Sequence, residues 1–422
     1  MEITTNIESF NADELYAPKW LNAQFFAEVL AKYEKDPELK VIDVKMSPAT
    51  AKGDHYASVM FRAKIDYTTQ NGTFTKSLII KTMPEEEGHK KGMLGNCKIF
   101  ETEVGMYTKV LPMFEEILRK VGDETRLSVA CLYHSLEPRK VLIFEDLLPD
   151  GYTVIRDRSA TIDELKAAYS KLAKWHAASF KLQDENPDFL KEYSYGLMAM
   201  PNLLEDQFMK SGMRLFIHFL DKTPELAKYK SYFESIETIY IDRFSKVLEE
   251  YRVNRQAGGY YVLSHGDFHL RNMLFKHNKT NQQLEDCMLV DFQICNLCPI
   301  TIDLIYSVYL LMGPNECRNS YKELFKFYYS ELIETLKKIG FRRVLPSLDT
   351  IWEQVAQHKY YEYFLLTTFL PMLCGVRTNT VDPADILQNE DIRQSLYFTD
   401  EFINYAKVLL PRYEKLGYLN EK

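Results

Sequence analysis

The stretch LSHGDFHLRNMLF, residues 263–275, decides how the whole chain is interpreted. An apolar run stops, Gly266 permits a sharp turn, and Asp267 follows directly. Five residues after Asp267, Asn272 opens a second apolar run. Polar side chains placed so tightly between two hydrophobic segments predict a functional loop held between two short buried strands.

A third polar group follows on the next predicted strand. Asp291 ends an apolar run in LVDFQ, after the polar segment HNKTNQQLED that predicts a hairpin. A hairpin brings the start of one strand beside the end of its partner, so Asn272 and Asp291 should lie close together. Two oxygen ligands suit Mg²⁺, which takes the rest of its shell from water and phosphates. Asp267 could then accept a proton from an attacking hydroxyl, the D-x4-N and D-F pattern of phosphoryl transfer in kinases.

A lysine and a glutamate form a second candidate pair nearer the N-terminus. Lys81 ends the apolar strand in SLIIKTMP, where it can neutralise nucleotide phosphates if another group orients it. Glu103, on the following predicted helix, shares an inward face with Met106 and Tyr107 and is the candidate partner. Glu101 lies only two residues away, and helical spacing alone does not choose between the two carboxylates.

The first part of the chain is predicted to combine an antiparallel sheet with helices. The first 35 residues show helical spacing, and the pair Asn71-Gly72 predicts a hairpin turn. A long helix is predicted over 98–120, broken or kinked at Pro112. Strands are predicted at 41–47, 55–67, 74–83 and within 128–147.

The rest of the chain is predicted to be mainly helical. A turn at 149–151 precedes a helix that begins with a capping box of Thr161 and Glu164. Further helices are predicted over 201–250 and 320–410, and short strands interrupt them at 260–294. We therefore expect an α+β protein with two lobes. Residues 1–147 would form a small lobe with an antiparallel sheet, and 148–422 a large helical lobe that carries the polar loop.

Composition narrows the function classes. A formal net charge of −8 over 422 residues argues against non-specific nucleic-acid binding, because no broad basic surface is available. The longest apolar stretch, 364–376, is too short to span a membrane, and 1–10 has no secretory signal. Seven cysteines, with one CxxC pair at Cys295 and Cys298, suit free thiols in a reducing compartment better than zinc. We expect a cytoplasmic protein with no nucleic-acid, membrane or obligate protein partner.

The motifs together resemble those of the protein-kinase-like fold in its small-molecule branch, which contains choline kinases and aminoglycoside phosphotransferases. The chain is most similar to the CHK kinase-like, or ecdysteroid kinase-like, family. The matching segments lie in the family's order over about 250 residues and are GDHYASVMFR (53–62), IIKTMP (79–84), FETEVGMY (100–107), VLIFEDL (141–147), LAKWHA (172–177), LSHGDFHLRNML (263–274) and LVDFQICNLCPITIDL (289–304).

The resemblance implies that ATP and Mg²⁺ are bound and that the γ-phosphate passes to a hydroxyl of a small molecule. It makes 1–147 the ATP-binding lobe and 148–422 the lobe with the catalytic loop and the acceptor pocket. In that scheme Asp267 is the catalytic base, and Asn272 and Asp291 are the magnesium ligands. Lys81 would hold phosphates with Glu103 as its clamp. The implied acceptor is a hydroxylated steroid or another apolar alcohol.

Two further cofactor contacts follow from the same resemblance. The turn from Gly53 to Ser58 would cover the phosphates, and because it lacks GxGxxG, Ser58 or backbone amides must do that work. The backbone from Glu145 to Leu147 would meet adenine. HGD in place of HRD, DFQ in place of DFG and the lack of an APE segment disfavour a protein substrate.

Two other function classes stay open. DFQ in place of DFG leaves room for a catalytically inactive pseudokinase that binds nucleotide or a small hydrophobic ligand. Asp267-x-His269 also resembles a ligand pair of a binuclear phosphoesterase, although nine histidines and no downstream GNH motif fit that class poorly. We expect structural roles for three other polar residues: His265 under the turn, His176 in the core, and Asp303 bonded to loop amides. His269 could lie near phosphate or substrate, and Arg271 is either a phosphate contact or a surface charge.

Overall fold

The computed structural model describes residues 16–49, 58–84, 97–200, 205–252, 255–377, 381 and 383–420. The chain forms two compact units, which we describe separately. Unit 1 contains Met1–Thr108 and Ser128–Tyr152, and unit 2 contains Lys109–Leu127 and Thr153–Lys422. The division expected from the sequence, at residue 147, differs in two respects: it assigned residues 109–127 to the first lobe and residues 148–152 to the second.

Unit 1 is built on a five-stranded antiparallel sheet with the strand order β1-β2-β3-β5-β4. The predicted hairpin joins β2 to β3, but Thr69 pairs with Gly72, so the two-residue turn is Gln70-Asn71, one residue earlier than predicted. Gly72 has a φ of +134°, which favours glycine. The strands are β1 (Lys40–Pro48), β2 (Val59–Thr69), β3 (Gly72–Thr82), β4 (Cys131–Ser135) and β5 (Val141–Glu145).

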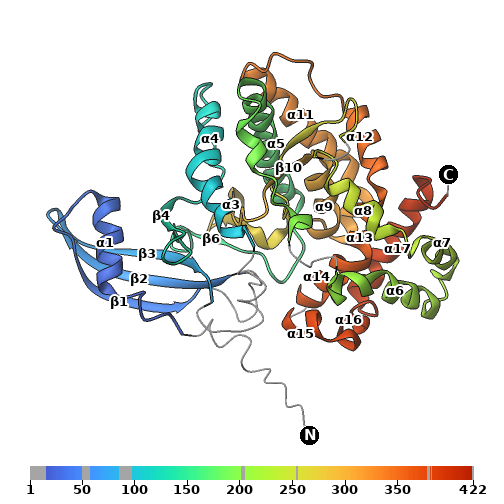
Figure 1. The fold of residues 1–422 in the computed structure, drawn as a ribbon, viewed down its shortest axis with the longest axis horizontal. Coiled ribbons are helices and arrows are strands. Elements are labelled where there is room, and N and C mark those ends of the chain that lie inside the picture. Colours follow the sequence, from blue (N-terminus) through green and yellow to red (C-terminus); the bar gives the residue numbers. More distant parts are fainter. Residues whose placement is uncertain are drawn as a thin grey trace, which may run out of the picture. The chain divides into compact units, whose positions relative to one another are not determined.

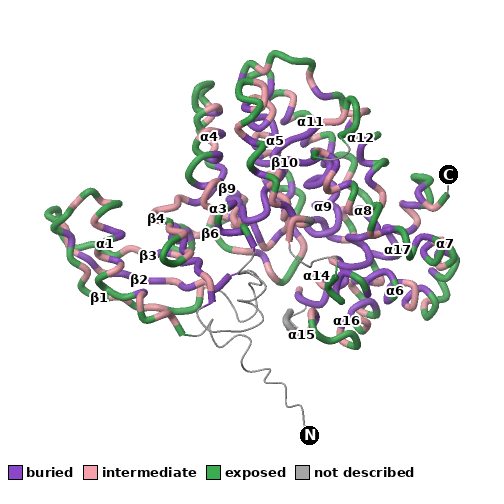
Figure 2. The backbone as a smooth tube through the Cα atoms, viewed as in Figure 1, coloured by how far each residue is buried: buried purple, intermediate pink, exposed green. Residues whose placement is uncertain are grey.

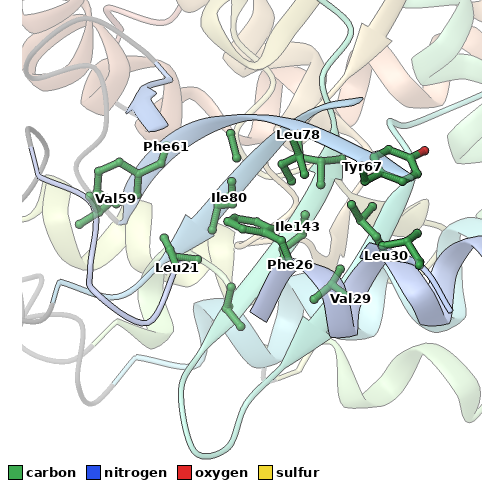
Figure 3. Packing of buried hydrophobic residues seen from close by; sticks show 14 residues of the cluster. Leu21, Phe26, Val29, Leu30, Val59, Phe61, Tyr67, Leu78, Ile80 and Ile143 are labelled. Carbon is green, nitrogen blue, oxygen red and sulfur yellow. The ribbon is translucent and has the colours of Figure 1, made fainter. Parts of the chain in front are cut away.

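One helix covers a face of this sheet and closes the core of unit 1 (Figure 1). Helix α1 (Ala23–Glu34) is capped by Asn22, whose side chain accepts from the Phe25 amide. It buries Phe26 against strand residues that include Ile80 and Ile143 (Figure 3). The prediction of helix over the first 35 residues was wrong for 16–22, which precede the cap, and residues 1–15 lie outside the described part.

The long helix predicted over 98–120 is divided into three parts. Helix α3 (Ile99–Gly105) continues into a π-helical turn (Met106–Val110) and then into α4 (Leu111–Arg119). Proline has no amide hydrogen to donate, and its ring crowds the preceding turn, so the regular α-helical ladder cannot run through Pro112. The predicted break is confirmed, with the distortion just before the proline.

Unit 2 is mainly helical. Its helix α5 (Ile162–Glu185) begins with the predicted capping box of Thr161 and Glu164, and it packs against α11. The other helices are α6 (Gln207–Lys222), α7 (Lys230–Ile236), α8 (Tyr240–Leu248), α9 (Thr301–Leu310), α10 (Pro314–Asn319), α11 (Tyr321–Lys338), α12 (Leu348–Gln357), α13 (Lys359–Phe364), α14 (Leu370–Arg377), α15 (Pro383–Gln388), α16 (Glu390–Leu396) and α17 (Asp400–Lys415). Every residue of α9 is buried, as Figure 2 shows. The predicted α+β class, with one sheet unit and one mainly helical unit, is confirmed.

Short strands interrupt these helices where the sequence predicted them. Strand β8 (Met273–His277) pairs with β9 (Leu284–Leu289) as an antiparallel hairpin, and β7 (Tyr261–Ser264) pairs with β10 (Asn296–Pro299). A two-residue strand, β6 (Tyr152–Thr153), stands where unit 2 resumes. The polar loop that opened the sequence analysis therefore connects β7 to β8.

Two further expectations from composition can be compared with the structure. No helix in the described ranges has both the length and the apolar character needed to cross a membrane. All seven cysteines fall in the described part and are free thiols. Cys295 and Cys298 are buried, and the Cys298 thiol lies 3.1 Å from the Ser264 hydroxyl, so the CxxC pair packs in the core.

Candidate active site

In unit 1, the predicted lysine–glutamate pair is formed. Lys81 stands near the end of β3, between Met60 of β2 and Leu142 of β5, and its side chain is buried. Its Nζ lies 2.6 Å from the Glu103 Oε2. The neighbouring Glu101 instead pairs with Lys140 at 2.8 Å, on the exposed side of the helix. A buried ammonium and carboxylate must stay paired to offset their lost hydration, so this contact is a rigid one.

The other residues predicted to meet the nucleotide lie at the ends of strands. Ser58 is buried immediately before β2, whereas 53–57, the rest of the predicted phosphate turn, fall outside the described residues. Glu145 Oε1 accepts from the Ala130 amide at 2.6 Å. Leu147 is buried, and its carbonyl accepts from the amides of Asp150 and Tyr152. Their contacts with nucleotide stay a prediction.

Sequence reasoning missed the residue that fixes this last segment. Asp146 is buried, and its Oδ2 accepts from the Arg62 Nε and the Ser77 hydroxyl, each at 2.6 Å. Its Oδ1 accepts from the Leu148 amide at 3.1 Å. The carboxylate thereby ties β2 and β3 to the chain that leaves β5. An acid inside the apolar run VLIFEDL was the available signal, because a buried charge needs partners.

In unit 2, the catalytic loop depends on one glycine. Gly266 has a φ of +81°, in the left-handed region that side chains disfavour. A Cβ at this position would stand 2.6 Å from the Ile294 carbonyl oxygen, closer than any real contact allows. The chain can therefore turn this tightly before Asp267 only with glycine.

An acid on helix α9 binds the loop backbone through hydrogen bonds. Asp303 accepts from the amides of His265 at 2.8 Å and Gly266 at 2.9 Å, and its Oδ2 also lies 3.1 Å from the His176 Nε2. The other nitrogen of His176 bonds to the Tyr328 hydroxyl at 2.6 Å. The structural roles predicted for Asp303 and His176 are confirmed.

His265 also has the structural role that the sequence predicted. Its ring is buried, and Nε2 lies 3.1 Å from the Val290 carbonyl oxygen, while Nδ1 faces the Asp267 amide. Burial lowers the pKa of His265 despite the negative charges of Asp303, Asp267 and Asp291. A neutral ring that donates through Nε2 and accepts through Nδ1 fits these neighbours.

The Asp267 carboxylate is surrounded by donors. Asn272 Nδ2 donates to Oδ2 at 2.9 Å and to the Asp267 carbonyl at 3.1 Å. The Tyr306 hydroxyl donates to Oδ1 at 2.6 Å, and His269 Nε2 lies 3.4 Å from the same oxygen. Burial would raise the pKa of the Asp267 carboxyl, but His269 and the Tyr306 hydroxyl hold it well below its usual range. The group is therefore an anion fixed at both oxygens.

Sequence reasoning did not identify Tyr306. Its position three residues after Asp303 places both on one side of a helix, and this spacing was the only available signal. In the apolar run ITIDLIYSVYL an aromatic residue is expected to belong to the core, and Tyr306 is indeed buried.

The two predicted magnesium ligands are neighbours across the β8–β9 hairpin. The Val290 amide donates to the Asn272 carbonyl at 3.1 Å, so Asp291 is one residue beyond the position opposite Asn272. Asp291 has a φ of +67°, a strained conformation for a residue with a side chain. The predicted proximity of the two residues is confirmed.

These residues fit Mg²⁺ in their donor chemistry. The Asn272 amide nitrogen is bonded to Asp267, so its Oδ1 points away from that carboxylate and can act as a ligand. A carboxylate and an amide oxygen are hard ligands, and magnesium in kinases completes its octahedral shell with water and phosphate oxygens. No cluster of three or more His, Cys, Asp or Glu side chains suited to a metal occurs within the described ranges, and magnesium needs none.

Comparisons with known proteins place the chain in a family. No curated protein matches it. Among solved structures, an amicoumacin kinase in complex with AMP-PNP, Ca²⁺ and Ami is similar with 14% identity and a TM-score of 0.34, over 81% of this chain and 86% of that one. At that score the likeness supports no conclusion about ligands. The model of the ecdysteroid kinase-like family matches residues 52–341, more than half of the chain. The chain therefore belongs to the ecdysteroid kinase-like family.

Proposed function

We propose that this protein is a small-molecule kinase that transfers the γ-phosphoryl group of ATP to a hydroxyl of an apolar acceptor such as an ecdysteroid. The observation that carries the proposal is the Asp267 carboxylate, which His269 and the Tyr306 hydroxyl keep ionised and which Asn272 and Tyr306 hold by hydrogen bonds. It lies on a loop next to the hairpin that presents Asp291. Family membership supports the same reaction class.

In the proposed reaction the acceptor oxygen attacks the γ-phosphorus, and the bond from phosphorus to the ADP oxygen breaks. The acceptor hydroxyl proton passes to the Asp267 carboxylate, so the products are a phosphate ester, ADP and a proton. General-base help of this kind contributes about 10²–10⁴-fold in rate. Most of the remaining acceleration comes from positioning and from neutralising charge on the phosphates.

Nucleotide binding is assigned to groups in both units. Asn272 and Asp291 would hold Mg²⁺, which neutralises phosphate charge when bound. Lys81, oriented by Glu103, would contact phosphate oxygens, and Ser58 would lie under the phosphate turn. The backbone from Glu145 to Leu147 would bind adenine. In this proposal the acceptor is the only partner, and the reaction takes place in the cytoplasm.

Aromatic rings beside Asp267 support an apolar acceptor. The Tyr306 ring lies 6.3 Å from the His269 ring and 6.5 Å from Phe369, which is only partly buried. Tyr361 lines a cavity next to Gly266. Phe364, on the same helix as Tyr361, is fully buried and stacks on Phe244 with ring centroids 4.0 Å apart, so it belongs to the core.

The direct test is transfer of ³²P from [γ-³²P]ATP to a panel of ecdysteroids and other hydroxylated apolar molecules in the presence of Mg²⁺. We expect a labelled phosphate ester whose formation depends on magnesium. Asp267→Asn is the control that removes the base and keeps the volume. The proposal fails if no acceptor in the panel or in a mixed metabolite extract is labelled.

A pseudokinase is the alternative with an observation in its favour. Gln293, at the place of the glycine in DFG, directs its Nε2 to the Asp291 Oδ2 at 3.4 Å. An amide that competes for this carboxylate would weaken metal binding. Under this alternative, nucleotide binds without transfer and Gln293→Gly creates or raises activity. If the parent protein labels an acceptor, the pseudokinase alternative is ruled out.

A further inference from the structure

Helix α9 carries two groups that act on the same loop. Asp303 holds the backbone amides of His265 and Gly266, and Tyr306, one helical turn later, donates to the Asp267 side chain. The first contact fixes the path of the chain, and the second fixes the direction of a carboxylate. Only the contact with Asp303 is needed for the loop to turn, because Gly266 and the hydrogen bonds from the loop amides to Asp303 already define that turn.

The Tyr306 hydroxyl is placed as a permanent donor. Its bond to Asp267 Oδ1 is 2.6 Å long, and only 4% of the residue surface is exposed. Burial and the adjacent negative charge of Asp267 raise the pKa of Tyr306 well above its ordinary value, so the hydroxyl keeps its proton. A short bond from a neutral donor to a charged acceptor is among the stronger hydrogen bonds in proteins.

The two oxygens of Asp267 are held from different elements. Asn272, at the start of β8, donates to Oδ2, and Tyr306 donates to Oδ1. Two donors on opposite oxygens stop the carboxylate from rotating about its Cβ–Cγ bond. Each carboxylate oxygen has two lone pairs. Oδ1 also faces His269 Nε2 at 3.4 Å, whereas Oδ2 keeps a lone pair that can accept another hydrogen bond.

We propose that Tyr306 is a positioning residue for the reaction: it holds Asp267 in the orientation that accepts the hydroxyl proton of the acceptor. The inference rests on the proposed function. Tyr306 itself exchanges no proton in the step, since the proton from the acceptor passes to Asp267. Without the Tyr306 hydroxyl, the carboxylate would keep only the Asn272 bond and the longer 3.4 Å approach of His269, and it could then rotate away from the attacking oxygen.

The same helix offers a matched control. Tyr309, three residues further along α9, is also buried and also donates to a carboxylate, Glu362 Oε2, at 2.6 Å. Tyr309→Phe removes a hydroxyl of the same kind, from the same helix, without touching Asp267. A general loss of packing or helix stability should therefore affect both variants alike.

The experiment compares steady-state kinetics of Tyr306→Phe and Tyr309→Phe with the parent. For Tyr306→Phe we expect kcat to fall roughly 10- to 100-fold, the range of a hydrogen bond to a charged group. KM for Mg·ATP should stay within about twofold, because nucleotide binding does not use this bond. Tyr309→Phe should keep the parent kcat. Equal losses of kcat in both variants, or a parent-like kcat in Tyr306→Phe, overturn the inference.

A double-mutant cycle separates positioning from a structural effect. In an Asp267→Asn background, Tyr306→Phe should lower the residual kcat by no more than about twofold, because Tyr306 acts through that carboxylate. A further loss of about tenfold or more would mean that Tyr306 acts independently of Asp267, and the inference fails.

The outcome also distinguishes this inference from the proposed function. A parent protein that transfers no phosphate contradicts both. If the parent protein transfers phosphate and the Tyr306→Phe variant has the same kcat, only the inference is contradicted. The contact can be tested without turnover, because a cycle of Tyr306→Phe and Asp267→Asn in unfolding free energy should show coupling, whereas Tyr309→Phe and Asp267→Asn should be additive. Additivity of the first pair overturns the inference.

Discussion

Helix α9 points tyrosines at two carboxylates, and the two sites differ in how they are closed. Tyr309 donates to Glu362, whose side chain is 1% exposed and forms an ion pair with Arg412 and a hydrogen bond with the Tyr418 hydroxyl. Tyr306 donates to Asp267, whose side chain is 19% exposed and whose other neighbours are the Asn272 amide and His269 Nε2.

The difference separates structure from chemistry. At Glu362 the countercharge is the Arg412 guanidinium, which also lies over the rings of Tyr321 and Tyr413. The contacts of this carboxylate are therefore all made within the protein, and it cannot act on a substrate. At Asp267 the charge is oriented by hydrogen bonds but stays open to an incoming group. A fully buried carboxylate paired with a fixed guanidinium is a structural element, and one oriented by hydrogen bonds in a partly open place can act on a substrate.

The largest expected effect tests the open site. Asp267→Asn should lower kcat by about 10²–10⁴-fold, because the amide cannot accept the hydroxyl proton. Binding of Mg·ATP, measured by calorimetry, should persist, since the proposed nucleotide contacts are unchanged. Turnover within tenfold of the parent would remove Asp267 from the mechanism and make its geometry as structural as that of Glu362.

The closed site should respond in stability. Arg412→Met leaves the Glu362 charge buried without its cation, and it should lower the free energy of unfolding by about 3–5 kcal/mol. Urea denaturation measures the loss. The double variant Arg412→Met with Glu362→Gln should recover much of it, because no buried charge then remains. The folded protein should keep the parent kcat, and a tenfold fall would mean that the closed site also serves the reaction.

The lysine–glutamate pair of unit 1 allows a comparison of two adjacent acids. Glu103→Gln should lower kcat/KM for Mg·ATP by about 10- to 100-fold, because Lys81 loses its charged partner. Glu101→Gln, which removes the more exposed partner of Lys140, should change it by less than about threefold. Similar effects of both substitutions on ATP kinetics would contradict the assignment of Glu103 as the clamp.

The smallest expected effect concerns the backbone under Asp267. Gly266→Ala should lower the free energy of unfolding by about 1–3 kcal/mol, since the new methyl meets the Ile294 carbonyl and φ is positive. Gly340→Ala is the control, with a φ of +70° and no atom within 4 Å of the added Cβ, and should cost only about 1 kcal/mol. Thermal unfolding of both variants tests whether the close approach matters beyond the dihedral angle.

Local patterns predicted the elements well and their ends less well. The capping box at Thr161 and the β8–β9 hairpin follow from neighbouring residues, so sequence spacing was sufficient to place them. Helix α1 begins at Ala23 because Asn22 caps it, although apolar residues recur from Trp20 onward. The hairpin turn is centred on Gln70-Asn71 because pairing resumes at Gly72. Apolar periodicity continues past the point where backbone bonding stops, and it therefore overextends helices.

By itself the sequence determined the family, the α+β class and the proximity of Asn272 and Asp291 near Asp267. The motifs and periodic patterns behind these conclusions depend on short spacings along the chain. Only the tertiary structure decided which groups hold that constellation. Tyr306 lies 39 residues from Asp267, and its hydroxyl reaches the carboxylate because α9 packs beneath the loop. A separation of 39 residues carries no information on such a contact. It arises only when helix, loop and hairpin are packed together, which fixes the direction of each side chain.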